Sequence, residues 1–294
     1  MPPDLVPIAS DRISAAINPL GAELWSLRDG AGRNYLTDAD PAFWTGHAPL
    51  LFPIVGALNG GTYRLGACEY ALPRHGFART SRFALVAHDA ASATFRLTDS
   101  PETRASWPFA FQLDMVFTAE GDTLRTEARV TNPDTCPLWF SFGFHPAFAW
   151  PLPGGAAREA HRLVFADCEP EPVRRLDPAS GLVLPGPQPT PVDGDTLAPT
   201  PALFESDALI MDGLRSRRCT WGAPGGSRLE LHFPDSPMLG IWQKPGAAFL
   251  CIEPWQGLAD PVGFAGDFRV KPGMVELDGG GTCRFRMDLR VIPG

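Results

Sequence analysis

The sequence contains no apolar run long enough to cross a membrane. The longest, Leu50 to Leu58, is about half a bilayer span and is interrupted by Pro53 and Gly56. The N-terminal stretch MPPDLVPIASDR has neither the basic nor the apolar region of a secretory signal peptide. We therefore expect a soluble, cytoplasmic protein with no membrane partner.

Positive charge is also scarce, because the formal net charge of the 294 residues is −8. A nucleic-acid partner requires a basic face that neutralises phosphates, so this balance argues against one. The acidic surplus is accounted for by solubility.

The six cysteines form no CxxC motif and lie far apart, which argues against a disulfide framework. Cys251 and Cys283 lie in apolar, strand-like runs, where a thiol behaves as a small hydrophobic group. We expect the cysteines to be reduced core residues of an intracellular protein.

Metal and nucleotide motifs are missing as well. None of the six histidines has an acid two residues later, and the adjacent His88 and Asp89 would point to opposite faces of a strand. There is no Gly-rich phosphate loop and no G-x-S-x-G motif. We therefore expect neither a metal site nor a cofactor.

Helix signals are few, whereas turn-forming residues are abundant. The 30 glycines and 32 prolines make up about a fifth of the chain, a density typical of short strands joined by turns. The N-cap signal Asp40-Pro41 leaves room only for a short turn before Gly46.

Apolar residues alternate on both sides of the turn Glu120–Asp122, with Phe109, Phe111, Leu113, Met115 and Phe117 before it and Leu124, Thr126, Ala128 and Val130 after it. This pattern predicts a β-hairpin with one solvated face.

The same pattern recurs at the C-terminus around the turn Asp278–Gly281, with Val275 and Leu277 before it and Cys283, Phe285, Met287, Leu289 and Val291 after it. Phe83–Ala87 and Phe95–Leu97 predict another strand pair.

Residues Pro170–Pro201 hold nine prolines, but strand-like residues lie within and just after this segment, so we interpret it as a surface excursion rather than a linker. The sequence predicts one all-β domain over residues 1–294, built from large antiparallel sheets.

The stretch WFSFGFHPAFAW, residues 139–150, places a histidine in an otherwise apolar run. On a strand, one face would carry Leu138, Phe140, Phe142 and Phe144, and the other Trp139, Ser141, Gly143 and His145. The small Ser141 and Gly143 leave room for a ligand beside His145, and Pro146 is expected to end or bend the ladder. The alternative is a core histidine satisfied by a neighbour.

The stretch FLCIEPWQGLAD, residues 249–260, places a carboxylate in a similar run. Glu253 would share a strand face with Cys251 and Trp255, where a carboxylate is costly unless it is paired. Burial would raise its pKa toward neutrality, which suits a general base, and Trp255 supplies the flat apolar face that sugar sites use. Pro254 predicts that the ladder ends there too. The alternative is a structural salt bridge or a surface carboxylate at a strand end.

A third stretch, PRHGFAR at residues 73–79, predicts a turn at His75-Gly76 flanked by Arg74 and Arg79. Taken alone, it is interpreted as a solvated basic loop. His145 and Glu253 each follow an apolar run and each precede a proline, and a shared site explains that coincidence better than two independent accidents.

Together these stretches resemble the aldose 1-epimerase (galactose mutarotase-like) superfamily, in particular its LacX-like branch. The specific segments are FGFHPAF and CIEPWQGLAD, in this order and about a hundred residues apart. The shorter matches are LLFPIVGAL, RHGFAR, WPFAF, ESDALIMDG and LGIWQKPGAAF. The resemblance implies a large antiparallel β-sandwich, the galactose mutarotase-like supersandwich.

The resemblance also implies an isomerase that interconverts the α and β anomers of a hexose without a cofactor. By position, Glu253 resembles the family's general base and His145 its general acid, acting from opposite sides of the sugar. His75 resembles a histidine that orients substrate, and Asp207 a carboxylate that takes sugar hydroxyls. Trp255, with Trp242 or Trp44, would stack on the sugar.

One departure affects the substrate. Ala57 stands where the branch often carries an arginine, so Arg79 or Arg64 would have to supply that hydrogen-bonding arm. Arg74 and Arg79 would also suit a phosphate group, so a hexose-6-phosphate 1-epimerase is one alternative. A sugar-binding protein that has lost the chemistry is another. A monomer or a homodimer is expected.

Overall fold

The computed structural model describes residues 4–294, and all pairings between its named strands are antiparallel. A nine-stranded sheet has the order β15-β14-β17-β18-β22-β10-β9-β8-β7. Its strands are β7 (Ala84–His88), β8 (Ser92–Thr98), β9 (Gln112–Glu120), β10 (Thr123–Thr131), β14 (Arg162–Phe165), β15 (Thr196–Leu197), β17 (Arg218–Gly222), β18 (Arg228–His232) and β22 (Thr282–Ile292).

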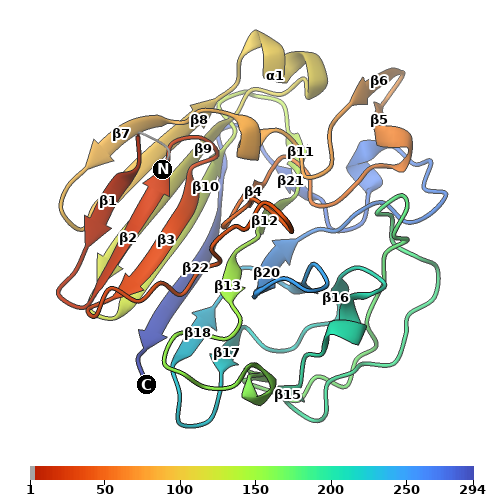
Figure 1. Cartoon of the computed structure of the whole chain (residues 1–294). Coiled ribbons are helices and arrows are strands. Elements are labelled where there is room, and N and C mark those ends of the chain that lie inside the picture. Colours follow the sequence, from red (N-terminus) through yellow and green to blue (C-terminus); the bar gives the residue numbers. More distant parts are fainter. Residues whose placement is uncertain (1–3) are drawn as a thin grey trace.

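Two smaller sheets cover one face of this large sheet (Figure 1). Three strands form the first and pack on β8–β10: β1 (Val6–Ala9), β2 (Ile13–Asn18) and β3 (Glu23–Asp29). The second has the order β16-β19-β20-β12-β4, and β13 also pairs with β20. Its strands are β4 (Leu50–Leu51), β12 (Phe142–Phe144), β13 (Ala147–Ala149), β16 (Leu209–Met211), β19 (Met238–Trp242) and β20 (Phe249–Gln256). The predicted antiparallel β-sandwich is confirmed.

The remaining elements are short. Two strand pairs lie outside the large sheets: β5 (Thr62–Leu65) with β6 (Cys68–Ala71), and β11 (Leu138–Phe140) with β21 (Val275–Leu277). The helical elements are α1 (Pro101–Ser106) and the 3-10 turns η1 (Asn59–Gly61), η2 (Ala78–Thr80), η3 (Arg158–Ala160), η4 (Pro201–Phe204) and η5 (Phe268–Val270). No helix within residues 4–294 is long and apolar enough to span a bilayer.

The alternating apolar residues form the core between the sheets, as expected. Leu113, Met115 and Phe117 of β9 are each at most 1% exposed, and β9 pairs with β10 through the predicted turn. The rings of Phe142 in β12 and Phe285 in β22 stack with centroids 5.0 Å apart, which joins the second small sheet to the large one. The predicted pairing of β7 with β8 is also confirmed.

The predicted C-terminal hairpin is wrong. β21 pairs with β11, whereas β22 lies in the large sheet between β10 and β18. The intervening turn docks on a neighbouring loop, because the Gly280 N–H donates to the carbonyls of Asn132 and Asp134. That contact sends the chain into a different sheet instead of back along β21.

The cysteine prediction holds only in part. All six cysteines are free, and Cys219 and Cys251 are buried. Cys283 is only partly buried, and Cys68, Cys136 and Cys168 are exposed rather than in the core. These three lie on a short hairpin and in loops, where the local sequence has no sustained apolar alternation.

The proline-rich segment folds back onto the second small sheet. Arg174 forms a bridge with Ile210 of β16, and Val183 bridges Leu176 and Pro261. Val183 and Leu176 are at most 5% exposed. The segment therefore packs as an excursion against the edge of that sheet.

One buried ion pair anchors the loop that follows β20. Lys271 Nζ lies 2.9 Å from Asp260 Oδ1, with side chains 1% and 4% exposed. The ammonium also donates to the Leu258 carbonyl, and Asp260 Oδ2 accepts the Asn59 N–H. Burial lowers the pKa of Lys271, and the neighbouring Asp260 opposes that shift.

We predict that Lys271→Met lowers the free energy of unfolding by about 3–5 kcal/mol, because it leaves the Asp260 carboxylate buried without its counter-ion. Urea unfolding measures this. The double variant Lys271→Met/Asp260→Asn should lose less, and Arg104→Met, in the exposed pair with Asp99, should lose at most about 1 kcal/mol. A double variant that is less stable than Lys271→Met would contradict the prediction.

Candidate active site

A cavity of about 210 Å³ lies beside β20 and the link between β12 and β13. All seven residues predicted for the site line it: His75, Arg79, His145, Asp207, Trp242, Glu253 and Trp255. Trp44 and Arg74 line it as well. The fold thus brings together stretches of sequence that lie up to about two hundred residues apart, and the roles of these residues stay predictions.

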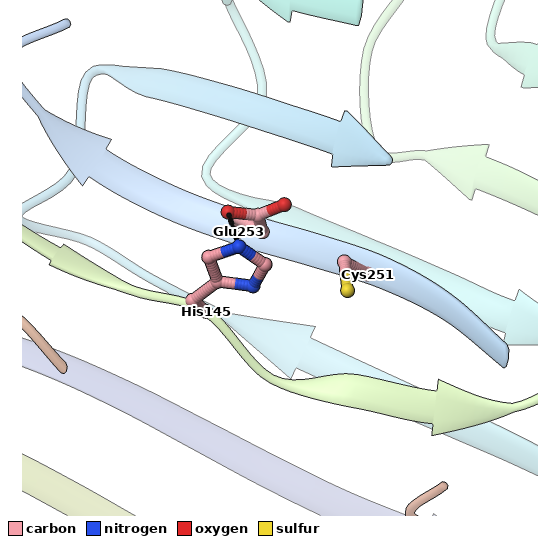
Figure 2. Close-up of side chains that lie close together, drawn as sticks. All are labelled: His145, Cys251 and Glu253. Atoms are coloured by element: carbon pink, nitrogen blue, oxygen red, sulfur yellow. Dashed lines mark ion pairs between the residues drawn. The ribbon is translucent and has the colours of Figure 1, made fainter. Parts of the chain in front are cut away.

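His145 and Glu253 meet at the wall of this cavity (Figure 2). Nε2 of His145 lies 3.3 Å from Oε2 of Glu253, and the side chains are 10% and 1% exposed. The expectation that they act from opposite sides of a sugar does not fit this contact. Two adjacent groups instead suit two oxygens bonded to one carbon atom.

The backbone explains how the two side chains meet. The ladder breaks between β12 and β13 at His145-Pro146, as predicted, and the Ile252 N–H donates to the Pro146 carbonyl across that gap. The prediction that Pro254 ends its strand is wrong, because β20 continues to Gln256. Pro254 lies two residues after Ile252, so its missing N–H faces the same gap and costs no ladder bond.

Burial disfavours charge on both members of the pair. It lowers the pKa of His145 to about 3, and the nearby guanidinium groups of Arg74 and Arg79 act in the same direction. Burial raises the pKa of Glu253 well above its ordinary value, and Asp207 adds to that shift while Arg74 opposes it. Burial therefore favours a neutral imidazole beside a protonated carboxyl over the charged pair.

His75 presents one defined tautomer. Its Nδ1 accepts the Gly56 N–H at 3.1 Å, so the ring proton of the neutral imidazole is on Nε2. Burial holds the pKa of His75 well below its ordinary value, and the positive field of neighbouring groups adds to this. The turn at His75-Gly76 is confirmed, with the Gly76 N–H donating to the Pro73 carbonyl. His75 is buried rather than part of a solvated loop.

Charged groups from two loops face each other across the cavity. Arg74 Nη2 lies 4.0 Å from Asp207 Oδ2, and Asp207 Oδ1 accepts the Ala208 N–H. Asp207 has a φ of +64°, an uncommon conformation for a residue other than glycine. Arg79 lies near Arg74, and burial followed by that neighbouring charge lowers its pKa.

Trp44 covers His145 from the loop that joins β3 to β4, residues 30–49, which we call the strap. The two rings stack with centroids 5.0 Å apart, and Trp44 meets Trp242 edge to face. Asp40 begins the short turn predicted there, since its carbonyl accepts the Trp44 N–H. Glu23 holds the other end of the strap, where Oε1 accepts the N–H groups of His47 and Ala48.

The space beside Gly143 is filled by Trp255 and not by a ligand, which corrects the expectation from the sequence. A Cβ at Gly143 would lie 2.5 Å from Trp255 Cδ1, and one at Gly240 would lie 2.4 Å from the far edge of the same indole. The other small residue, Ser141, accepts the Val55 N–H with its hydroxyl. The two glycines let the indole lie close against the sheet, with its Nε1 buried and acting on the Glu253 carboxyl.

Some lining residues were not predicted for the site. Leu176 comes from the proline-rich segment, Ile210 from β16 and Ala259 from the loop after β20. Gly240 could have been found, because an isolated glycine in a strand pattern indicates close approach of another group. Arg64 does not replace the arginine that the branch often carries at the position of Ala57. Its guanidinium donates to the Ala265 carbonyl outside this cavity.

Comparisons with known proteins agree with this fold. The family model described as aldose 1-epimerase matches residues 4–262. Protein LacX of Lactococcus lactis, in its plasmid form, is 30% identical over 98% of this chain and 99% of its own length.

Solved structures are similar over nearly the whole chain. A galactose mutarotase-like protein from Lactobacillus casei has a TM-score of 0.91 and 28% identity, covering 98% of this chain and 100% of its own. A galactose mutarotase related enzyme from Lactobacillus acidophilus has a TM-score of 0.89 and 28% identity, covering 98% and 97%. The chain belongs to the aldose 1-epimerase family.

We predict that Gly143→Ala lowers the free energy of unfolding by about 1–3 kcal/mol, because the added Cβ forces Trp255 from its place against the sheet. Thermal unfolding followed by tryptophan fluorescence measures both effects. Gly30→Ala is the matched control, since a Cβ there makes an ordinary contact of 3.6 Å with the Arg12 carbonyl. Equal melting temperatures for Gly143→Ala and the wild type would refute the overlap.

Proposed function

We propose that this chain is an aldose 1-epimerase acting as one domain of residues 1–294, interconverting the α and β anomers of a hexose. The observation that carries the proposal is the buried contact of 3.3 Å between His145 and Glu253 on the wall of a cavity. Family membership supports the reaction class.

The reaction needs one proton removed and one delivered at oxygens that share carbon C1. Glu253 takes the proton of the O1 hydroxyl while His145 gives one to the ring oxygen. The bond between C1 and the ring oxygen then breaks, and an aldehyde forms. After rotation about the C1–C2 bond, the ring closes on the other face, and both protons return. Each positioned transfer contributes on the order of 10²–10⁴-fold.

Throughout this cycle one exchangeable proton is shared between the His145 imidazole and the Glu253 carboxyl. The net charge of the buried pair therefore does not change. The neutral form, with the proton on Glu253, is the one that faces the open-chain aldehyde. Arg74 opposes the rise in the pKa of Glu253, and so favours the carboxylate that the ring-opening step requires. No metal or nucleotide is needed for these steps.

The surrounding groups suit a polyhydroxylated ring. The Nε2–H of His75 is a fixed donor, and Asp207 offers a carboxylate acceptor. Trp44, Trp242 and Trp255 supply apolar faces on the cavity lining. We propose that His75 and Asp207 orient sugar hydroxyls while the tryptophans cover the ring.

A second candidate, a hexose-6-phosphate 1-epimerase, is favoured by Arg79. Within residues 4–294 its guanidinium makes no ion pair or hydrogen bond, although burial and the adjacent Arg74 both lower its pKa. The charge of Glu23 partly offsets that shift, but this carboxylate accepts the N–H groups of His47 and Ala48. Two neighbouring guanidinium groups suit a phosphate, which accepts bidentate hydrogen bonds from arginine.

We predict that Glu253→Gln and His145→Asn each lower kcat for anomer interconversion by at least about 10²-fold, because each removes one of the two proton-transfer groups. NMR exchange spectroscopy on a series of free and phosphorylated aldoses measures the rate. Glu230→Gln and His232→Asn, made on β18 outside the cavity, are the matched controls and should keep full activity.

Wild-type rates in both Glu253→Gln and His145→Asn would sink the proposed mechanism. A wild-type protein that binds sugar by tryptophan fluorescence but accelerates no interconversion would instead be a sugar-binding protein of this family.

We predict that Arg79→Ala lowers kcat/KM for a hexose 6-phosphate about 10–100-fold, the loss expected for a hydrogen bond to a charged group. The same variant should change kcat/KM for the free hexose by less than about threefold. Arg64→Ala, an arginine outside the cavity, is the control. An equal loss for both substrates would assign Arg79 to the sugar ring and rule out selection of a phosphate.

A further inference from the structure

Three side chains that bind metals lie together at the wall of the cavity. One ligand atom each from His145, Cys251 and Glu253 lie within 4.8 Å of one another, and all three residues are buried. Figure 2 shows Cys251 and Glu253 on β20 and His145 on the facing segment. Cys251 and Glu253 are two residues apart on one strand, so their side chains project from the same face.

One polar atom of this cluster has no partner in the described part of the protein. His145 Nδ1 is buried and without a hydrogen bond, whereas Glu253 Oε2 lies 3.3 Å from His145 Nε2. His145 is 8% exposed and Glu253 1%, so neither atom is left to bulk solvent. A buried polar group normally has a partner, and a bound cation would supply one for this nitrogen.

The donor set selects the type of cation. An imidazole nitrogen, a thiolate sulfur and a carboxylate oxygen are the three ligand types of zinc, and three protein ligands with an open fourth position are typical of an accessible zinc ion. Hard cations such as Mg²⁺ prefer oxygen ligands and would not use the thiol. The cavity supplies the open position, since His145 and Glu253 both line it.

The charges around the cluster are compatible with a bound dication. Binding would displace the protons of Cys251 and Glu253, and the resulting two negative charges would balance those of the ion. Arg74 and Arg79 repel a cation, while Asp207 and the buried Glu23 lie near these arginines and offset them.

We propose that His145, Cys251 and Glu253 bind one zinc ion, and that zinc and sugar exclude each other from the cavity. Cys251 is then the residue that gives the site its affinity for a soft metal, although it does not itself line the cavity. Only the inhibition of catalysis rests on the proposed function; the binding of metal does not.

Cobalt is the spectroscopic probe, because a thiolate bound to Co²⁺ gives an intense charge-transfer band in the near ultraviolet. The full chain is treated with a chelator, dialysed and titrated with Co²⁺ and then Zn²⁺. The exposed thiols are first removed by Cys68→Ser, Cys136→Ser and Cys168→Ser, which leave the buried Cys219 and Cys251 and the partly buried Cys283. We expect one equivalent of Co²⁺ to produce the band and Zn²⁺ to abolish it.

Substitution of the thiol decides the assignment. In this background Cys251→Ser should abolish the band and weaken zinc binding at least about 10-fold, since even partners outside the first ligand sphere contribute 10–100-fold. Cys251→Ala serves as a second variant, and Cys219→Ser, another buried cysteine on β17, should keep the band. No band in the background protein, or a band that survives in Cys251→Ser, would overturn the proposal.

Activity gives a separate readout. Micromolar ZnCl₂ should inhibit anomer interconversion by the background protein and leave Cys251→Ser, which retains the proton-transfer pair, active. Equal inhibition of both proteins would overturn the assignment of Cys251. A cobalt band in a protein without epimerase activity would support the metal site and count only against the proposed function.

Discussion

The contact between His145 and Glu253 depends on a break in one β ladder. Two prolines face the same gap from opposite sides, Pro146 between β12 and β13, and Pro254 within β20. The His145 N–H instead donates to the Pro49 carbonyl, so the residue is held by the strap that carries Trp44. Removing ladder bonds at this point lets the chain bend around His145 without leaving buried N–H groups unpaired.

Much of the fold was predictable because alternation reports locally on burial. The hairpin of β9 and β10 followed from period two in the sequence, and the strand containing Glu253 followed from its continuous apolar run. The partner of β21 did not, because a strand's neighbour depends on where its turn docks, here against Asn132 and Asp134. Sequence patterns specify which residues face inward, whereas pairing is decided by contacts between distant segments.

The site shows the same division. Strand geometry predicted which face of each strand carries His145 and Glu253. That the two residues share one site was inferred only because each follows an apolar run and precedes a proline. What occupies the space beside a small residue was not predictable. Gly143 lies under Trp255, which reaches it from a strand more than a hundred residues later. A glycine records that something approaches closely, but not whether it is a ligand or a side chain.

The burial that suits this pair for the proposed proton transfer also places it beside a side chain that binds metals. In a low-dielectric wall both groups prefer to be neutral, so a proton can move between substrate and protein without a large change in solvation. Within residues 4–294 the same wall leaves His145 Nδ1 unpartnered, and a thiol lies in the same cluster. In the proposed metal site, alanine in place of Cys251 would remove the thiolate ligand and leave a small cavity beside His145 and Glu253. Cys251 pairs with Ala147 of β13 and Trp242 of β19, so its side chain also fills space between two neighbouring strands of the sheet.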